Sequence, residues 1–486
     1  MPYTHPDDNN LKNLHKAMQY SDSQEPELRV SIGEGIDISG TVNIPGNLTI
    51  DNFPAIQPVS GTVSVDSLPE PVSIDDNGGS ITVDGTIQIA PGSYNSTGNL
   101  DNSVDAFGRL RISDMYTLFD SSLRYDDNPF KWDTALSGTG AINHLPNESS
   151  MQMSTTGAGS VIRQSKTVFS YQPGKSLLSL TTFAMGTPTA GVTKRAGYYG
   201  AENGIFFELD GTNIKIVKRS SITGLVVDTG ITQPFWNVDK LDGTGPSGID
   251  LNEDRAQIFW CDIEWLGVGS VRTGFVINGQ FITCHIFHHA NTETGVYMTT
   301  ASLPVRYELI STGAASSMKQ ICSSVISEGG YVNRSRTRSV STPLTGKALS
   351  DVTYTPLVSI KLKNNRLDSV VVPSKFDLFG LQQAAYKYQL ILNPILTNPS
   401  WSSLNNLSDV DYDISATGLS GGIVIDEGIF VGSNKGGSIA VSQTDVDFSQ
   451  QLGRTIAGVS DIFCLAAIAT TNNDDAVGSL TWQEHS

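Results

Sequence analysis

The stretch from Ile258 to His289 constrains the fold of this chain more than any other. Its first part has apolar residues at every second position from Phe259 to Trp265. This period of two is typical of a strand with one fully buried face. The Asn-Gly pair at 278–279, flanked by apolar alternation, predicts a hairpin because both turn residues must adopt positive φ. Antiparallel strands of this kind need a second sheet to cover their apolar face. We therefore expect this stretch at the centre of a β-sandwich.

The composition of the chain also favours an all-β fold. A length of 486 residues predicts about two to four domains. Only 16% of the residues are charged, and 47 are glycine. Such a composition is typical of turn-rich all-β architecture with polar faces rather than of exposed helices. The net charge of −18, with one short basic run near Arg336, argues against nucleic acid as a partner.

Membrane and redox signals point to a chain that folds in the cytoplasm. The N-terminal residues are polar and lack the apolar core of a signal peptide. No window approaches the ~20 apolar residues of a membrane span, so we expect no membrane insertion and no export by a standard route. Among the cysteines (Cys261, Cys284, Cys322 and Cys464), Cys261 and Cys284 are placed to pair across the hairpin. Buried free thiols in a reducing cytoplasm are the alternative, and we favour it.

Residues 1–27 are polar and predict a docking segment. We expect one short helix with a narrow apolar stripe formed by Leu11, Leu14 and Met18. Such a narrow stripe cannot bury itself, and a helix this short is marginal alone. We therefore expect residues 1–27 to anchor the chain to another protein.

Residues 28–104 repeat a short alternating pattern and predict a stalk. The pattern Ile38–Ile44 (ISGTVNI) recurs as Val59–Val65 (VSGTVSV) and as Val83–Ile89 (VDGTIQI), and prolines separate the units. Each unit is a short strand with a single apolar row. One chain cannot cover that row, but three chains wound about an axis can. We therefore expect a homotrimeric β-shaft. A flexible Gly/Pro linker is the alternative, and the regular alternation argues against it.

A junction motif follows the repeats over residues 105–121. It runs Asp105–Ser113 (DAFGRLRIS) and then Thr117–Ser121 (TLFDS). With the repeats before it, this motif resembles a family of tailed-bacteriophage virion proteins that carry a DAFGRLR(V/I)S…TLFDS junction. Asn13–Met18 and Asp262–Gly267 look similar to that family too. The resemblance implies a structural protein of the virion, assembled in the host cytoplasm, and it carries over no catalytic residues and no cofactor.

Two folded regions are expected after the stalk. Residues 105–335 form the body, where Asp210-Gly211 joins two further alternating segments as a hairpin. Alternating strands without helices suggest a concanavalin-like jelly roll, similar to legume-lectin or laminin-G domains. The run 334–338 (RSRTR) and the Ser/Thr-rich residues after it predict a linker. Residues 345–486 predict a C-terminal β-sandwich domain.

Asp262 and Glu264 are the residues that suggest chemistry. They match the last two positions of the Glu-x-Asp-x-Glu strand motif of the laminarinase and xyloglucan-transglycosylase family, but Trp260 occupies the nucleophile position. A retaining glycosidase without its nucleophile cannot form the glycosyl-enzyme, so we expect no catalytic site. Instead, we consider a carbohydrate site in which Trp260 stacks on a sugar ring while Asp262 and Glu264 accept hydroxyl hydrogen bonds. The alternative is that Trp260 packs in the core.

The only histidine cluster does not predict a metal site. His285 and His289 share one face of a strand, whereas His288 points to the other, so the three cannot easily converge on one ion. The sequence contains no Ser/His/Asp set, Walker loop or cysteine pair with zinc spacing. We therefore expect neither a metal nor a cofactor.

Two classes of function compete at this point. The first is a structural and binding protein: a homotrimeric tail or baseplate fibre or appendage that is used in host attachment. It would join other virion proteins through its N-terminus, with host surface glycan as a possible ligand. Capsid decoration or a head fibre is an alternative location. The second class is a glycan-cleaving tailspike, and the missing paired-carboxylate signature favours the first.

Overall fold

The computed structural model describes residues 114–432, 439–442 and 450–485. The expected anchor (1–27), the expected stalk (28–104) and most of the junction motif lie outside the described residues, so they stay predictions. Within the described part the chain is all-β, with only short 3₁₀ turns and no α-helix. These residues form no helix long and apolar enough to span a membrane. The all-β class predicted from the composition is confirmed.

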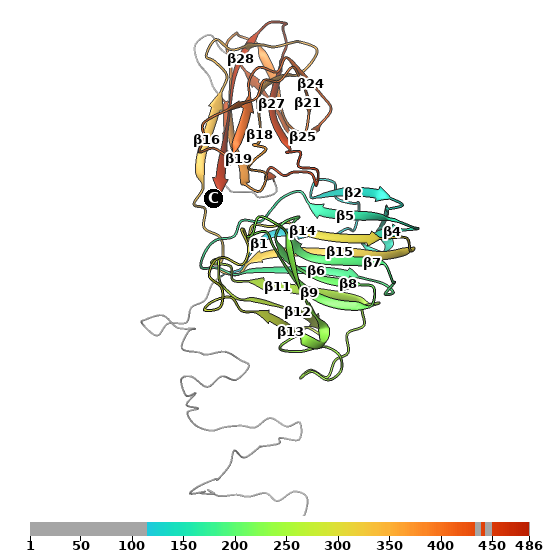
Figure 1. Ribbon diagram of the computed structural model, residues 1–486. Coiled ribbons are helices and arrows are strands. Elements are labelled where there is room, and N and C mark those ends of the chain that lie inside the picture. Colours follow the sequence, from blue (N-terminus) through green and yellow to red (C-terminus); the bar gives the residue numbers. More distant parts are fainter. Residues whose placement is uncertain (1–113, 433–438, 443–449, 486) are drawn as a thin grey trace, which may run out of the picture. The chain divides into compact units, whose positions relative to one another are not determined.

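The first folded region is a sandwich of an eight-stranded and a seven-stranded antiparallel sheet (Figure 1). The eight-stranded sheet has the order β13-β12-β11-β6-β15-β4-β3, and β1 also pairs with β15. Its strands are β1 (Tyr116–Ser121), β3 (Ala141–Leu145), β4 (Ser150–Thr155), β6 (Leu177–Ala184), β11 (Ala256–Ile263), β12 (Val271–Ile277), β13 (Gln280–Phe287) and β15 (Ser316–Ser327).

The seven-stranded sheet covers the apolar face of the first. Its order is β10-β9-β8-β7-β14-β5-β2. The strands are β2 (Trp132–Gly138), β5 (Gly159–Ser165), β7 (Val192–Tyr199), β8 (Gly204–Asp210), β9 (Asn213–Ser220), β10 (Val227–Thr232) and β14 (Val305–Ser311). Aromatic rings from both sheets meet between them: the Phe183 and Phe207 centroids lie 5.6 Å apart, and those of Phe207 and Phe275 lie 5.3 Å apart.

The stretch from Ile258 to His289 forms most of β11 and all of β12 and β13, as predicted, but its place in the sheet differs from the prediction. Asn278 and Gly279 adopt φ values of 53° and 78° and join β12 to β13, which confirms the hairpin. However, β13 is an edge strand and β6 is nearer the middle of the sheet. The expectation that this stretch forms the centre of the sandwich is therefore wrong. β12 and β13 pair only with strands of this stretch, whereas β11 also pairs with β6, which comes from a distant part of the chain.

The second folded region is another sandwich with its own core. A five-stranded sheet has the order β16-β28-β19-β26, with β17 also paired to β28. Its strands are β16 (Arg336–Ser341), β17 (Lys347–Ala348), β19 (Val370–Gly380), β26 (Ile439–Ser442) and β28 (Asp475–His485). The run that was expected to be a linker therefore contains strand β16, because its backbone pairs with β28 from Arg336 to Ser341.

The facing sheet is six-stranded, with the order β22-β23-β18-β27-β20-β25. Its strands are β18 (Thr355–Leu362), β20 (Ala385–Leu392), β22 (Ser402–Ser403), β23 (Val410–Asp413), β25 (Ile423–Val431) and β27 (Ile462–Ala469). A short ribbon of β21 (Ile395–Thr397) and β24 (Gly418–Ser420) accompanies it. Phe376 of β19 and Tyr388 of β20 contact across the core, with centroids 5.0 Å apart.

All four cysteines are free thiols. Cys261, Cys284 and Cys464 are buried, and burial raises the pKa of each of these three thiols. The favoured alternative of free thiols is confirmed, and no disulfide links Cys261 to Cys284. A raised thiol pKa keeps the sulfur protonated, so these residues act as small apolar side chains in the cores.

Candidate functional site

Strand β11 divides its side chains between the two faces of the eight-stranded sheet. Phe259, Cys261 and Ile263 belong to the core of the first sandwich. Because successive side chains of a strand point to opposite faces, Trp260 and Asp262 lie on the outer face. The predicted division of this strand into an apolar face and a mixed face is therefore correct, and the candidate residues share the outer side.

Trp260 is nevertheless buried. Only 4% of its surface is exposed, and its ring packs edge-on against Phe281 of β13, with centroids 5.5 Å apart. Its indole Nε1 has no hydrogen-bond partner within the described residues. A stacking platform needs an open ring face, so this placement favours the packed-aromatic alternative for Trp260. Phe281, which is 54% exposed, is the accessible ring of this surface.

Asp262 is buried but only half of its carboxylate is paired. Arg272 lies directly opposite on β12, and its Nε and Nη2 both donate to Oδ2, with Nε at 2.9 Å. The neighbour on the other side is Leu178 of β6, which offers no donor. Asp262 Oδ1 therefore has no hydrogen-bond partner among the described residues. Burial raises the pKa of Asp262, while the charge and hydrogen bonds of Arg272 oppose the rise.

Asp262 and Glu264 line the same open pocket. The pocket has a volume of about 520 Å³ and is lined by Gly174, Lys175, Ser176, Asp262, Glu264, Leu266, Ser270 and Arg272. We call this the Asp262 pocket. Glu264 is exposed, and its Oε2 accepts a long hydrogen bond of 3.4 Å from the Ser270 amide. Trp260 does not line this pocket, so the structure unites two of the three candidate residues and separates the third.

Two cationic side chains, Lys175 and Arg272, line the Asp262 pocket, and each is held by hydrogen bonds to neighbouring residues. Lys175 Nζ donates to the side-chain oxygen of Gln172 at 2.9 Å and to the Gly330 carbonyl at 3.0 Å. The Arg272 side chain is 59% exposed and is anchored only through Asp262 among the described residues. The pocket thus combines an unpaired buried acceptor, an exposed carboxylate and two cationic donors. Such a set has both donors and acceptors for the hydroxyl groups of a ligand, because each hydroxyl both donates and accepts.

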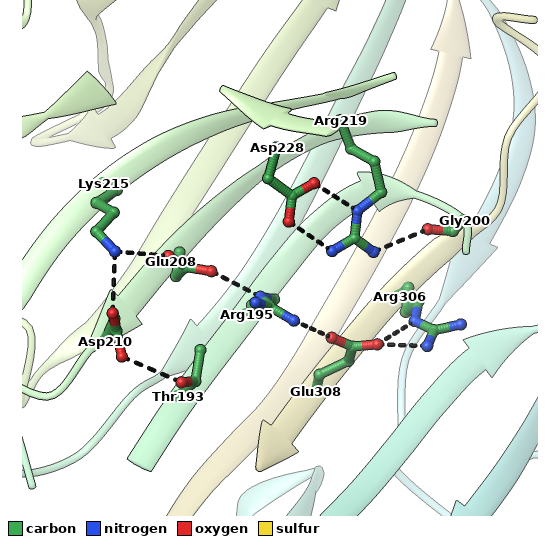
Figure 2. Close-up of polar contacts among 10 residues, drawn as sticks. All are labelled: Thr193, Arg195, Gly200, Glu208, Asp210, Lys215, Arg219, Asp228, Arg306 and Glu308. Carbon is green, nitrogen blue, oxygen red and sulfur yellow. Dashed lines mark hydrogen bonds and ion pairs between the residues drawn. The ribbon is translucent and has the colours of Figure 1, made fainter. Parts of the chain in front are cut away.

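A second polar cluster lies on the outer face of the seven-stranded sheet (Figure 2). Its central row runs across neighbouring strands and alternates in charge: Glu308 of β14, Arg195 of β7, Glu208 of β8 and Lys215 of β9 are directly opposite in register. We call this row and its attached residues, Asp210 and Arg306, the charged network; the ion pair of Arg219 and Asp228 lies beside it.

The charged network satisfies its own members. Glu308 accepts from Arg306 Nε at 2.6 Å and from Arg195 Nη1 at 3.1 Å. Arg195 Nε donates to Glu208 at 2.7 Å. Burial alone would raise the pKa of Glu308, but the charges and hydrogen bonds of Arg306 and Arg195 outweigh it, and the pKa is lowered. Because every carboxylate in the row is paired, we read the network as part of the scaffold.

The sequence pattern alone does not predict the charged network. Its members come from separate strands, and only their register brings them together. The available signal was local: charged residues stand two apart at Glu208 and Asp210, and at Arg306 and Glu308, between apolar residues. That spacing places both members of a pair on one strand face, but it does not name the partner strand.

The histidines bind separate partners. His289 stacks on Tyr297, with centroids 3.8 Å apart, and its Nδ1 lies 2.7 Å from the Gly269 carbonyl. His285 Nδ1 accepts from the Asn237 amide at 3.3 Å. Across the described ranges no group of three or more His, Cys, Asp or Glu residues is arranged to hold a metal ion.

The expected docking residues Leu11, Leu14 and Met18 lie outside the described residues.

Comparisons with known proteins give structural likenesses alone. No family model matches the chain, and no curated protein matches it. One similar solved structure is the CBM2 module of the evolved Dit of Lactobacillus casei BL23 phage J-1, at 6% identity and a TM-score of 0.28, covering 46% of this chain and 100% of that one.

Two further solved structures are similar at the same level. A carbohydrate esterase of Shiga toxin-encoding bacteriophage phi24B matches at 8% identity and a TM-score of 0.25, covering 44% of this chain and 100% of that one. Arcelin-5, a lectin-like defence protein of Phaseolus vulgaris, matches at 9% identity and a TM-score of 0.28, covering 44% and 99%.

Proposed function

We propose that this chain is a structural component of a bacteriophage virion, a fibre or appendage used in host attachment, and that its first sandwich binds surface carbohydrate in the Asp262 pocket. The virion assignment rests on the junction motif and the repeats of the sequence. The observation that carries the carbohydrate assignment is the placement of Asp262, which lines an open pocket and whose buried Oδ1 has no hydrogen-bond partner among the described residues.

An unpaired buried acceptor is costly for the folded chain alone. Leaving such a group unsatisfied costs about 1–3 kcal/mol, and more when the group is charged. Arg272 holds the other oxygen of the carboxylate, which orients Oδ1 without satisfying it. A hydroxyl donor from a ligand supplies the missing hydrogen bond.

The remaining lining fits a sugar better than an apolar ligand. Glu264 offers exposed acceptor oxygens, and Lys175 and Arg272 offer donors on the same rim. Leu266 is exposed at the pocket and provides an apolar surface for the C–H face of a sugar ring. A pyranose has polar hydroxyl groups around an apolar C–H face, and this pocket offers polar partners for the first and an apolar contact for the second.

Binding is tested with glycan arrays and a matched pair of variants. Wild-type chain should bind a subset of bacterial surface glycans, and Asp262→Asn should weaken that binding about 10- to 150-fold, because one charge-assisted hydrogen bond is lost. Asp254→Asn makes the same chemical change at an exposed position outside the pocket and should bind like wild type. No bound glycan for the wild type, or equal binding by both variants, would overturn the carbohydrate assignment.

Two measurements separate the alternatives for the whole protein. Mass spectrometry of the bound glycan after incubation should find it intact, whereas shortened products would favour a cleaving tailspike. Labelled electron microscopy of the virion should place the chain on a tail or baseplate fibre, whereas label on the capsid would favour a decoration or head-fibre role.

The oligomer and the anchor are part of the same proposal. The single apolar rows of residues 28–104 support a homotrimer, so light scattering on the full chain should give three chain masses. The stripe of Leu11, Leu14 and Met18 supports docking to other virion proteins. Deleting residues 1–27 should leave the oligomer folded but absent from assembled particles.

A further inference from the structure

Strand β25 is an exposed edge of the second sandwich. It spans nine residues, Ile423–Val431, and pairs only with β20 among the described strands. Ile429 is 70% exposed and Val431 is 65% exposed. An edge strand presents a row of unpaired N–H and C=O groups, and proteins usually blunt such an edge with lysine, proline or shortness. β25 contains neither lysine nor proline, and beyond a bulge at Ile425 its ladder with β20 is regular from Asp426 to Val431, so we take this part of its edge as able to pair with another strand.

The charges of β25 are acidic. Asp426 and Glu427 stand side by side in the middle of the strand. Glu427 is held by Lys387 at 3.0 Å and Gln389 at 3.1 Å on the neighbouring strand. Asp426 accepts only a long hydrogen bond of 3.4 Å from Tyr388 within the described part of the chain. The exposed edge therefore combines apolar side chains with an acidic centre.

The opposite edge of the same sandwich is basic. β16 is the edge strand of the five-stranded sheet, and it carries the only basic run that the sequence analysis found. Arg336 is exposed and has no ion pair among residues 114–432, 439–442 and 450–485. Arg338 lies 3.7 Å from the buried Glu484. In Figure 1, β16 and β25 lie on opposite sides of the second sandwich.

We infer that β25 of one chain pairs with β16 of a second copy of this chain. The basic edge complements the acidic edge, whereas two copies of β25 paired with each other would place like charges opposite, which destabilises a strand pair. Because the two edges differ and lie on opposite sides, the contact is heterologous and repeats from copy to copy until a ring closes. The contact joins the second sandwiches and does not depend on carbohydrate binding.

Cross-linking of two differently tagged full-length chains tests the pairing directly. One chain carries Thr337→Cys on β16 and the other carries Ile429→Cys on β25. A short bismaleimide should link the two tags when the chains are co-expressed, above the background of the wild-type chain with its partly exposed Cys322. Linking of Ile429→Cys chains to each other with equal yield, or no linking above background, would overturn the inference.

Charge reversal tests the complementarity with a second readout. Hydrogen exchange of the β25 backbone in the full chain should show protection along its free edge. Asp426→Lys or Arg336→Glu alone should weaken this protection about three- to tenfold, and the double variant should restore it, because an opposite pair is re-formed. Asp351→Lys, an exposed loop change in the same sandwich, should have no effect. Single reversals that leave the protection unchanged would contradict the inference.

Discussion

The two sheets of the first sandwich both carry acidic residues on their outer faces, but the acids have different neighbours. Glu208 on the seven-stranded sheet lies between Arg195 and Lys215, one on each adjacent strand. Asp262 on the eight-stranded sheet has an arginine on one side and Leu178 on the other. Among the described residues, the first acid is therefore paired through both oxygens, and the second through one.

This difference distinguishes the charged network, which we interpret as scaffold, from the Asp262 pocket, which we interpret as a candidate site. In a carboxylate with cations on both sides, both oxygens already have partners. The ion pairs around it stabilise the register of the strands that carry it. Asp262 has one oxygen that no described residue pairs, which is the property on which the proposed binding rests. The comparison predicts that the charged network matters most for stability and the Asp262 pocket most for binding.

The largest effect is expected from breaking the charged network. Glu308→Gln removes the charge that pairs Arg306 and Arg195, and both guanidinium groups then remain largely buried. Breaking a buried ion pair by removing one partner costs about 3–5 kcal/mol. Denaturant unfolding of the wild type and of Glu308→Gln should show this loss as a difference in the free energy of unfolding.

The matched variant on the other sheet is Asp262→Asn. Its partner Arg272 is largely exposed and is hydrated when the charge of Asp262 is removed. The free energy of unfolding should therefore fall by less than about 1 kcal/mol. Equal losses for Glu308→Gln and Asp262→Asn would remove the distinction between the two acids.

The next effect concerns the two aromatic residues that pack together on the outer face of the eight-stranded sheet. Trp260 is buried against Phe281, so Trp260→Ala should cost about 3 kcal/mol of stability through the cavity that it leaves. Phe281→Ala removes a largely exposed ring and should cost less than about 1 kcal/mol. Thermal unfolding of both variants checks this order. A small loss for Trp260→Ala, with loss of glycan binding, would instead support a stacking role for the indole.

The hairpin of β12 and β13 could be predicted from the sequence because its determinants are local. Asn278 and Gly279 specify the turn, and the period of two specifies which side chains of β11 enter the core. The edge position of β13 could not be predicted in the same way. It depends on which distant strands complete the sheet, and no local pattern encodes that choice.

The candidate site shows the same limit at the level of side chains. Alternation placed Trp260 and Asp262 on one face correctly, but the burial of Trp260 depends on Phe281, which stands two strands away. The unpaired oxygen of Asp262 likewise depends on Leu178 being its neighbour on β6. Cross-strand register determines both facts, and the charged network as well.

The smallest effect is the pH dependence of the two acids, and its sign differs between them. The folded-state pKa of Glu308 is lowered, so its contribution to stability is present above the unfolded pKa of about 4.3 and is lost as the pH falls through the folded pKa. The pKa of Asp262 is raised, chiefly by burial. Its ionised form is therefore disfavoured in the fold, and stability is regained as the pH falls through the raised pKa towards the unfolded value of about 3.9.

Unfolding free energies measured between about pH 3 and pH 7, for wild type, Glu308→Gln and Asp262→Asn, make this contrast visible. Because each variant removes one titrating group, subtracting its curve from that of the wild type isolates that group. The Glu308 difference should decrease as the pH falls, since protonation of Glu308 breaks its pairs with Arg306 and Arg195. The Asp262 difference should increase as the pH falls, since protonation removes a buried negative charge whose Oδ1 has no partner among the described residues. Differences of the same sign would mean that Asp262 is as well satisfied as Glu308, and the pocket would lose the property that distinguishes it.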